Sequence, residues 1–333
     1  MLYASKWGFV MKYFFILILF GCSSVKTINL KDHSFNESPK NIIWFQIAGL
    51  SPEHLALIRF DKSNLSQELE NFTCLGNMWA YNSYKLRPTP NESFLTQVTG
   101  KTNIKGICAD YSQKPLWYYL KDRGFETAIL EVGTSPSNGL DQAFACSEEN
   151  EFKNISYFFM GQGLKGNYKK LDLLDMKPFK TGRYQISCEF CEQNLFPTFT
   201  SIMDRSFENK KYKLFILRDF SFLKYLKMGD FNSAKFFLKE LAKTYKNLRE
   251  KRDTLILISS SGMAKIDLPS AGAQWIEFEK KGKNAPYKND SLLSFVLAQG
   301  PSSEKFCGIY SESDLMERIL MDPRKNFKKF LFW

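Results

Sequence analysis

Length and composition place the chain among globular proteins with a sizeable core, since it has 333 residues, of which 44% are hydrophobic and 16% aromatic. Its two histidines, His33 and His54, both lie early in the chain, which excludes mechanisms that need several imidazole groups late in the sequence. The net charge of +11 is not accompanied by a nucleic-acid-binding motif, so we expect a solvated basic surface and no nucleic-acid partner.

The N-terminal segment has the parts of a secretory signal. Lys12 stands before a short apolar run, Tyr13–Phe20, and the small residue Gly21 precedes Cys22. A cysteine in this place resembles the lipobox of a bacterial lipoprotein, in which the thiol is acylated and becomes the mature N-terminus. The run is shorter than the about 20 apolar residues that span a bilayer, which disfavours a transmembrane anchor.

The lipoprotein resemblance divides the chain into three parts. Residues 1–21 are the expected lipoprotein signal peptide, residues 22–40 a polar tether, and residues 41–333 one domain. Cys22 is the expected lipid anchor, carrying palmitate and attaching the protein to a membrane. Ser23, rather than Asp, resembles the outer-membrane sorting pattern, so we expect a lipid-anchored protein of the cell envelope at the outer membrane.

Two other interpretations of the N-terminal segment are an ordinary membrane anchor and a cleaved signal with an incidental cysteine. The start site is also open between Met1 and Met11, of which Met11 opens a tighter signal.

The basic surface is the basis of a further alternative. A peripheral adhesin of the cell envelope would use it to bind an acidic partner.

Six cysteines remain beside Cys22, and an even number in an exported protein predicts structural disulfides. Their connectivity is left open by the sequence. Cys188 and Cys191 have the spacing of half a zinc site or a redox pair, but no second pair or nearby histidine completes a metal site, so we expect no metal. The disulfide candidates are Cys74, Cys108, Cys146, Cys188, Cys191 and Cys307.

Short apolar runs typical of buried strands alternate with helical patterns along the domain. Strands are expected at 41–47, 126–132, 213–218, 254–258 and 292–298. Helices are expected from Ser51, at 90–100, 115–124 and 232–251, and at 313–320 with Ser313 as the N-cap. This alternation predicts the α/β class, with a mostly parallel central sheet covered by helices on both faces.

The glycines of residues 161–166 match a dinucleotide-binding fingerprint in letters only. No apolar helix follows them, and no strand–turn–helix unit surrounds them. We therefore interpret the segment as a loop and expect no nucleotide or other cofactor.

Five segments carry a family resemblance through their order and spacing. They are Ile42–Leu50, Thr96–Lys101, Pro115–Ile129, Asp253–Gly262 and Ser311–Leu320. The first looks like a strand that ends in Asp-Gly-Leu, the second like a Thr-Gly-Lys turn after a nucleophile helix, and the fourth like a strand leading into Ser-Asp-His-Gly. Together they resemble the alkaline phosphatase/sulfatase superfamily, which implies its α/β/α sandwich fold.

That resemblance also implies a metal pair held by carboxylates and imidazoles, which activates a serine or threonine nucleophile. The ligand positions depart from the family pattern. Ala48 stands where the first-strand aspartate belongs, Ser260 and Ser261 replace the Asp-His pair, and Asp219 alone matches a family carboxylate. A methyl group cannot bind a cation, and neutral hydroxyls are poor ligands without carboxylates.

The nucleophile position is also unsettled. The direct alignment places Pro90 there, and the hydroxyls of Thr89 and Ser93 lie close by. We therefore predict a pseudoenzyme without catalytic residues, whose vestigial pocket contains the six residues Ala48, Thr89, Ser93, Asp219, Ser260 and Ser261. The alternative is a divergent hydrolase of phosphate or sulfate esters.

Overall fold

The structure, a computed structural model, describes residues 38–59, 68–69, 71–133, 139–146, 150–161, 177–179, 183–186, 212–262, 265–266, 276, 287–288 and 292–321. The expected signal peptide, Cys22, most of the tether, Cys188 and Cys191 lie outside these residues. Within the described part, no helix combines the length and apolar character that a bilayer crossing needs. The described residues belong to a single compact unit, residues 34–333.

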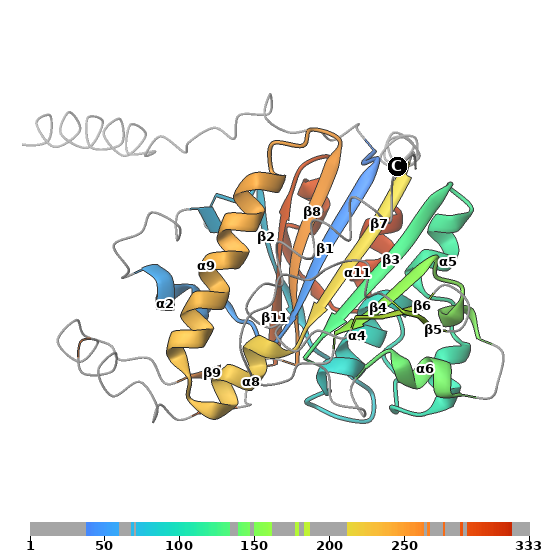
Figure 1. Ribbon diagram of the computed structural model, residues 1–333, viewed down its shortest axis with the longest axis horizontal. Helices are drawn as coiled ribbons and strands as arrows, with labels where there is room; N and C mark the ends of the chain where they lie inside the picture. Colours follow the sequence, from blue (N-terminus) through green and yellow to red (C-terminus); the bar gives the residue numbers. More distant parts are fainter. Residues whose placement is uncertain are drawn as a thin grey trace, which may run out of the picture. The chain divides into compact units, whose positions relative to one another are not determined.

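A ten-stranded sheet runs through the middle of this unit (Figure 1). Its strands in spatial order are β12 (Gly308–Ser311), β2 (Cys74–Trp79), β11 (Leu293–Gln299), β8 (Thr254–Ser261), β1 (Asn41–Ala48), β7 (Tyr212–Asp219), β3 (Phe125–Val132), β4 (Tyr157–Gly161), β6 (Arg183–Ile186) and β5 (Lys177–Phe179). The strands from β8 to β6 are parallel, whereas β11 is antiparallel to both of its neighbours. The expected, mostly parallel sheet is confirmed.

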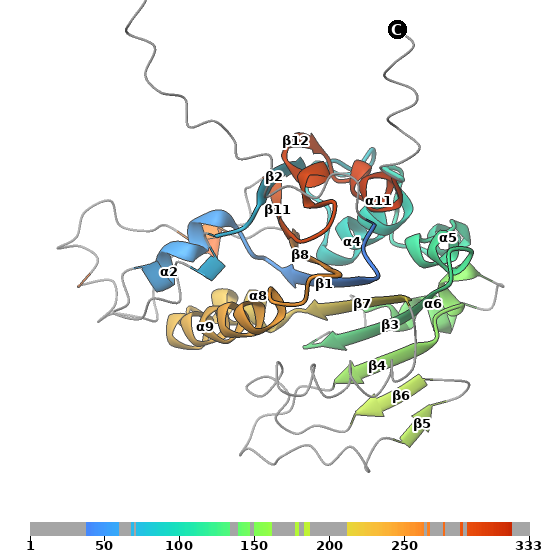
Figure 2. The same ribbon diagram turned by 90° about the horizontal axis from the view of Figure 1, so that it is seen from above.

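Helices cover both faces of the sheet (Figure 2). One face packs against α8 (Ser221–Met228) and α9 (Phe231–Leu248), and the other against α4 (Pro90–Thr99), α5 (Leu116–Lys121), α6 (Asp141–Ala145) and α11 (Asp314–Leu320). Strand side chains alternate between faces, so β1 places Phe45 in the first core and Trp44 in the second. Both residues are fully buried, as the continuous apolar run of β1 predicts.

Smaller elements complete the described part. They are the 3-10 helices η2 (Pro52–Leu55), η3 (Cys108–Ser112), η4 (Glu151–Lys153) and η6 (Ser303–Phe306), the short helix α2 (Ala56–Arg59), and a two-stranded sheet of β9 (Lys265–Ile266) and β10 (Tyr287–Lys288).

The expected helices and strands are present with small shifts at their ends, and Ser313 is the N-cap residue of α11, as expected. The Ser313 side chain makes no capping hydrogen bond to α11. Its hydroxyl donates to Ser311 Oγ at 2.8 Å, while Asp314 Oδ2 accepts from the Ser311 backbone N–H at 3.1 Å. The tight turn between β12 and α11 therefore engages these side chains with one another.

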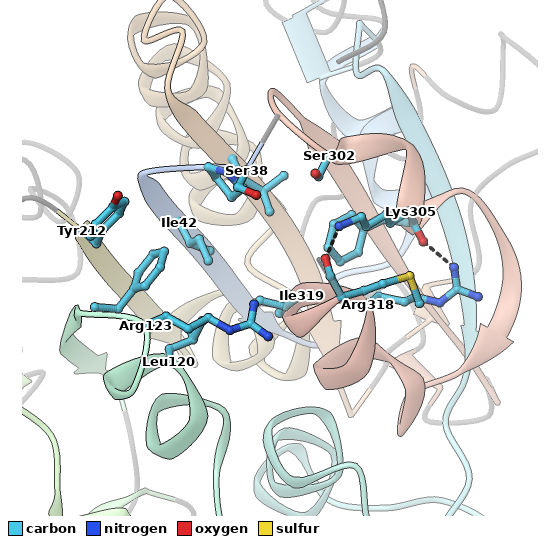
Figure 3. A pocket seen from close by; sticks show the side chains of 14 residues that line it. Ser38, Ile42, Leu120, Arg123, Tyr212, Ser302, Lys305, Arg318 and Ile319 are labelled. Carbon is cyan, nitrogen blue, oxygen red and sulfur yellow. Dashed lines mark hydrogen bonds between the residues drawn. The ribbon is translucent and has the colours of Figure 1, made fainter. Parts of the chain in front are cut away.

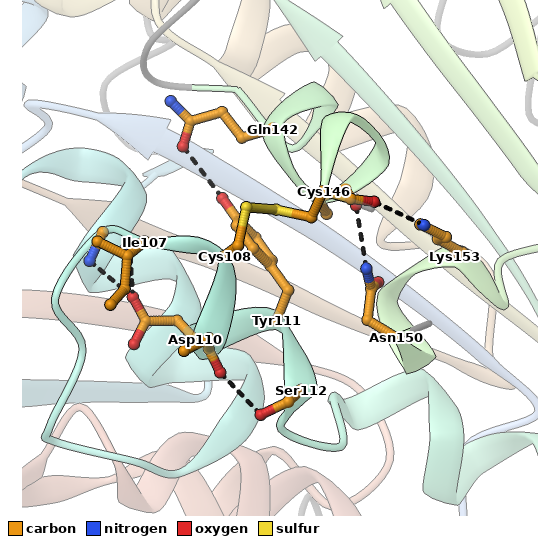
Figure 4. The surroundings of a disulfide bond; sticks show 12 residues. Ile107, Cys108, Asp110, Tyr111, Ser112, Gln142, Cys146, Asn150 and Lys153 are labelled. Carbon is orange, nitrogen blue, oxygen red and sulfur yellow. Dashed lines mark hydrogen bonds between the residues drawn. A yellow bond between two sulfur atoms is a disulfide. The ribbon is translucent and has the colours of Figure 1, made fainter. Parts of the chain in front are cut away.

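Two disulfides join segments that are distant in the sequence. Cys74 at the start of β2 pairs with Cys307, which directly precedes β12, and Cys108 in η3 pairs with Cys146 after α6 (Figure 4). The first bond closes a separation of 233 residues and the second one of 38. Four of the six candidate cysteines are therefore paired, which confirms the disulfide prediction for these four.

Candidate functional site

The carboxyl ends of three neighbouring parallel strands bring several of the predicted site residues together. Ile47 of β1 is in register with Asp219 of β7 and with Ser260 of β8, and Ala48 is in register with Ser261. In open α/β sheets, ligands bind at this edge. The edge is therefore the candidate site.

The start of α4 reaches the same edge. A Cβ atom added to Gly262, which directly follows β8, would lie 2.6 Å from Pro90 Cγ. Gly262 has a φ of +55°, and the close approach leaves no room for a side chain there. The end of β8 and the first residue of α4 are consequently in direct contact.

Asp219 is the carboxylate at this edge, and it has a structural partner. Its side chain is 1% exposed, and Oδ1 accepts a hydrogen bond of 2.6 Å from the Ser221 backbone N–H. Ser221 is the first residue of α8, whose early N–H groups have no partner within the helix. Asp219 thus stabilises the turn from β7 into α8.

The serines at the end of β8 are fully buried. Ser260 Oγ accepts a hydrogen bond of 3.3 Å from the Phe295 backbone N–H and so links β8 to β11. Ser261 Oγ has no hydrogen-bond partner among the described residues. Beside them, Ala48 contributes only a methyl group, so this part of the edge offers hydroxyls and no charge.

Thr89 is exposed and is the N-cap of α4. Its Oγ1 accepts from the Glu92 backbone N–H at 3.2 Å, and its own backbone N–H donates to Glu92 Oε2 at 2.8 Å. These two bonds form a capping box. The helix ends at Gly100, whose φ of 68° is left-handed, as is common at helix C-termini.

Ser93 does not share the exposed environment of Thr89. It is fully buried, and its hydroxyl donates to both carboxylate oxygens of Glu312, at 2.7 and 2.8 Å. Glu312 also accepts from Gln97 Nε2 at 2.9 Å and from Ser294 Oγ at 2.8 Å. Burial raises the pKa of Glu312 to about 7, although these three donors oppose the shift.

A second buried acid lies near the start of α4. Glu131 of β3 pairs with the Arg218 guanidinium of β7, and both side chains are fully buried. Arg218 Nη2 donates to Asn91 Oδ1 at 3.2 Å and Nε donates to Gln46 Oε1 at 3.3 Å. The guanidinium also lies 3.7 Å from the centre of the Phe94 ring.

The two acids belong to one polar layer between the sheet and α4. Glu131, Arg218, Gln46 and Ser259 occupy one transverse row of four neighbouring strands. Gln97 extends the layer, because its Oε1 accepts from Ser259 Oγ at 3.3 Å while its Nε2 contacts Glu312. This layer was not identified from the sequence, although a charged or amide residue in each of three buried strands was a signal for it.

The residues at the edge do not fit the metal pair that the superfamily implies. Among the described residues, no group of three His, Cys, Asp or Glu side chains could hold a metal ion. His54 lies apart in η2, where Nδ1 accepts from the Ser51 backbone N–H at 3.0 Å and the ring packs edge-on against Phe222. Burial lowers the pKa of His54 to about 3, so its ring is neutral.

Comparisons with known proteins agree with this fold. No protein-family model and no curated protein matches the sequence. Among solved structures, the chain is similar to alkaline phosphatase from the Antarctic bacterium TAB5, with a TM-score of 0.59, 14% identity, and coverage of 86% of this chain and 99% of that one. Alkaline phosphatase from Thermus thermophilus gives a TM-score of 0.60 at 10% identity, covering 92% of this chain and 98% of the other.

A third similar structure is the lipoteichoic acid synthase LtaP from Listeria monocytogenes, with a TM-score of 0.53, 13% identity, and coverage of 89% of this chain and 74% of that one. The protein therefore has the alkaline phosphatase/sulfatase-like fold, which confirms the fold predicted from the five sequence segments.

The buried Glu312 carboxyl predicts a dependence of stability on pH. An unfolded glutamate ionises near 4.5 and the folded Glu312 near 7, so the folded state binds more protons between these pH values. The free energy of unfolding contributed by Glu312 therefore falls as the pH rises through this window. We expect Glu312→Gln to gain stability relative to the wild type by about 3 kcal/mol between pH 4.5 and 7.5, measured by denaturant unfolding.

Glu317→Gln, which removes an exposed carboxylate from α11, is the matched control and should keep the wild-type pH profile. Parallel pH profiles for Glu312→Gln and the wild type would show that Glu312 is ionised in the folded state across the window.

Proposed function

We propose that this protein is a non-catalytic lipoprotein of the cell envelope, a pseudoenzyme with the alkaline phosphatase-like fold and a binding or structural role. The observation that carries the proposal is the side-chain content of the strand ends. Ala48, Ser260 and Ser261 supply no charge, and Asp219 accepts a hydrogen bond from the start of α8.

The ligand requirements of a divalent metal pair support the absence of catalysis at this edge. A metal pair lowers the pKa of a hydroxyl nucleophile and neutralises charge that develops on an ester oxygen. Holding two divalent cations takes several carboxylates or imidazoles, and one carboxylate with neighbouring hydroxyls is a poor donor set. Without the cations, the hydroxyl of Thr89 keeps its proton at neutral pH.

The envelope location is supported by two independent features. Cys22 follows a short apolar run, and the polar residues up to 40 separate it from β1. The disulfides Cys74–Cys307 and Cys108–Cys146 suit an oxidising compartment outside the cytoplasm. We propose attachment to the outer membrane through a lipid on Cys22, with acidic envelope polymers as the partners of the basic surface.

Metabolic labelling tests the lipid anchor. We expect a palmitate analogue to label the wild-type protein and not Cys22→Ala, because the acylated thiol is then absent. The control is Cys188→Ala, which keeps the lipobox unchanged. Label that persists in Cys22→Ala would contradict the anchor.

The alternative is a divergent ester hydrolase, and one observation favours it. Thr89 is exposed at the start of the ten-residue helix α4, beside the end of β8. The solved structures that are similar to the whole chain include alkaline phosphatases. In this reading Thr89 is the nucleophile. The two readings differ in whether any ester is turned over.

Turnover assays separate the two functions. We expect no hydrolysis of aryl phosphate, phosphodiester or aryl sulfate substrates above the buffer rate, with or without added zinc, magnesium, manganese or calcium. Metal-dependent turnover that is lost in both Thr89→Asn and Asp219→Asn would establish the hydrolase instead. Asparagine at position 89 removes the nucleophile but keeps a good N-cap, so loss of activity there is not a folding effect.

A further inference from the structure

A cavity of about 300 Å³ lies at the opposite edge of the sheet from the candidate site (Figure 3). Residues near the amino ends of four parallel strands contribute to its wall: Ile42 of β1, Phe125 of β3, Tyr212 of β7 and Leu255 of β8. Eight-residue strands are about 25 Å long, so the cavity and the candidate site are separate.

The wall combines apolar and polar surface, and its charged part is cationic. Its accessible apolar surface comes from half-buried residues, namely Pro39, Phe125, Tyr212 and Met321. Arg123, Lys305 and Arg318 also line the cavity, and its described lining residues include no Asp or Glu. A space with this lining favours a ligand that is both apolar and negatively charged.

The cations come from two sides. Arg123 follows α5, and Lys305 belongs to η6; Figure 3 shows both side chains reaching toward the same space. Lys305 Nζ donates to the Met321 carbonyl, and Arg318 donates to the Lys305 carbonyl while its guanidinium lies 3.7 Å from the centre of the Tyr310 ring. No hydrogen bond or ion pair of the Arg123 guanidinium is found among the described residues.

A strained residue lies in the same wall. Ser302 has a φ of 65°, and it is the non-glycine residue with a positive φ among the described residues. Such conformations persist where the surrounding structure enforces them, and they cluster at ligand sites. The strained backbone of Ser302 is therefore consistent with a ligand site at this wall.

We propose that this cavity binds an anionic amphiphile, a molecule with a phosphate or carboxylate group and a hydrocarbon part. The anionic group pairs with Arg123 and Lys305, and the hydrocarbon part packs on the half-buried Phe125, Tyr212 and Met321. Charge-assisted hydrogen bonds to a guanidinium and an ammonium are among the stronger protein–ligand contacts. The proposal is independent of the loss of catalysis, which concerns the other edge of the sheet.

The position of the cavity suits a ligand from the membrane. Ser38 and Pro39, the last part of the expected tether, belong to its lining. A lipid attached at Cys22 would therefore place the cavity's wall within one tether length of a lipid surface. A membrane phospholipid and a soluble amphiphile share the chemistry that the cavity selects, and the experiment separates them.

Isothermal titration of the full-length chain tests the proposal, with Cys22→Ala in every sample so that an attached lipid cannot compete. Three probes are used below micelle-forming concentrations: dodecyl phosphate, dodecyl maltoside and inorganic phosphate. We expect dodecyl phosphate to bind with one site per chain, and the other two to bind at least roughly tenfold more weakly, since each lacks half of the recognised chemistry.

Two variants connect binding to the cavity. Arg123→Gln and Lys305→Gln should each weaken dodecyl phosphate binding by roughly tenfold or more, the effect of losing one charge-assisted contact. Lys121→Gln, two residues from Arg123 and outside the cavity lining, is the matched control and should bind as the parent does. Thermal melting of each variant shows that the fold is retained.

Five outcomes decide the proposal. Equal binding of dodecyl maltoside, no binding of dodecyl phosphate, or equal affinities of Arg123→Gln and Lys121→Gln would each overturn it. Binding to phosphatidylglycerol vesicles, but not to phosphatidylcholine vesicles, that falls in Arg123→Gln would support it with a membrane lipid as the source. Loss of dodecyl phosphate binding in Arg123→Gln without any vesicle binding would support it with a soluble amphiphile.

Discussion

The placement of α4 on the sheet depends on buried acids that pair with basic or polar side chains. Glu131 and Arg218 are both fully buried, and burial shifts the pKa of each toward its neutral form while the partner's charge opposes the shift. Removing one member of such a pair leaves an uncompensated buried charge, at a cost of about 3–5 kcal/mol. Since Arg218 also contacts Asn91 and Phe94, the ion pair fixes the first turn of α4.

Glu312 fixes the position of the middle of α4. Ser93 and Gln97 are one turn apart on α4 and both donate to Glu312, which follows β12. A ten-residue helix is marginal in isolation, so these contacts and the apolar side chains of Phe94, Leu95 and Val98 determine where it lies. The position of α4, the helix that begins after Thr89, is consequently determined by buried groups that do not reach solvent.

The residues at the carboxyl edge have structural roles that do not depend on a metal ion. Asp219 supports the turn into α8, and Ser260 links β8 to β11, so both have structural reasons to be present. Ala48 and Ser261 are buried at the same edge and carry no charge. The fold needs these positions to pack and to hydrogen-bond, and it does not need them to bind cations.

The sequence predicted the central part of the fold because those strands are continuous apolar runs, as in β1, β7 and β8. It missed β2, in which Gly76 and Asn77 interrupt the apolar residues, and the shorter strands β12, β4, β6 and β5. The family resemblance grouped Ala48, Asp219, Ser260 and Ser261 in one candidate site, and the strand register makes them neighbours in the sheet.

The buried partners could not be predicted in the same way. Ser93 was expected beside Thr89, but helical geometry turns it toward the sheet. Glu131 and Arg218 are 87 residues apart, and Ser93 and Glu312 are 219 apart. Pairings over such separations follow from strand order, as does the choice of Cys74 with Cys307.

We propose that the carboxyl edge of this sheet does not hold the metal pair of the superfamily that the sequence resembles. Equilibrium dialysis of the purified protein against zinc, magnesium or calcium, followed by elemental analysis, tests it most directly. The account predicts no stoichiometric metal, and the same result for the wild type and Asp219→Asn. One or two tightly bound ions per chain that are lost in Asp219→Asn would contradict it.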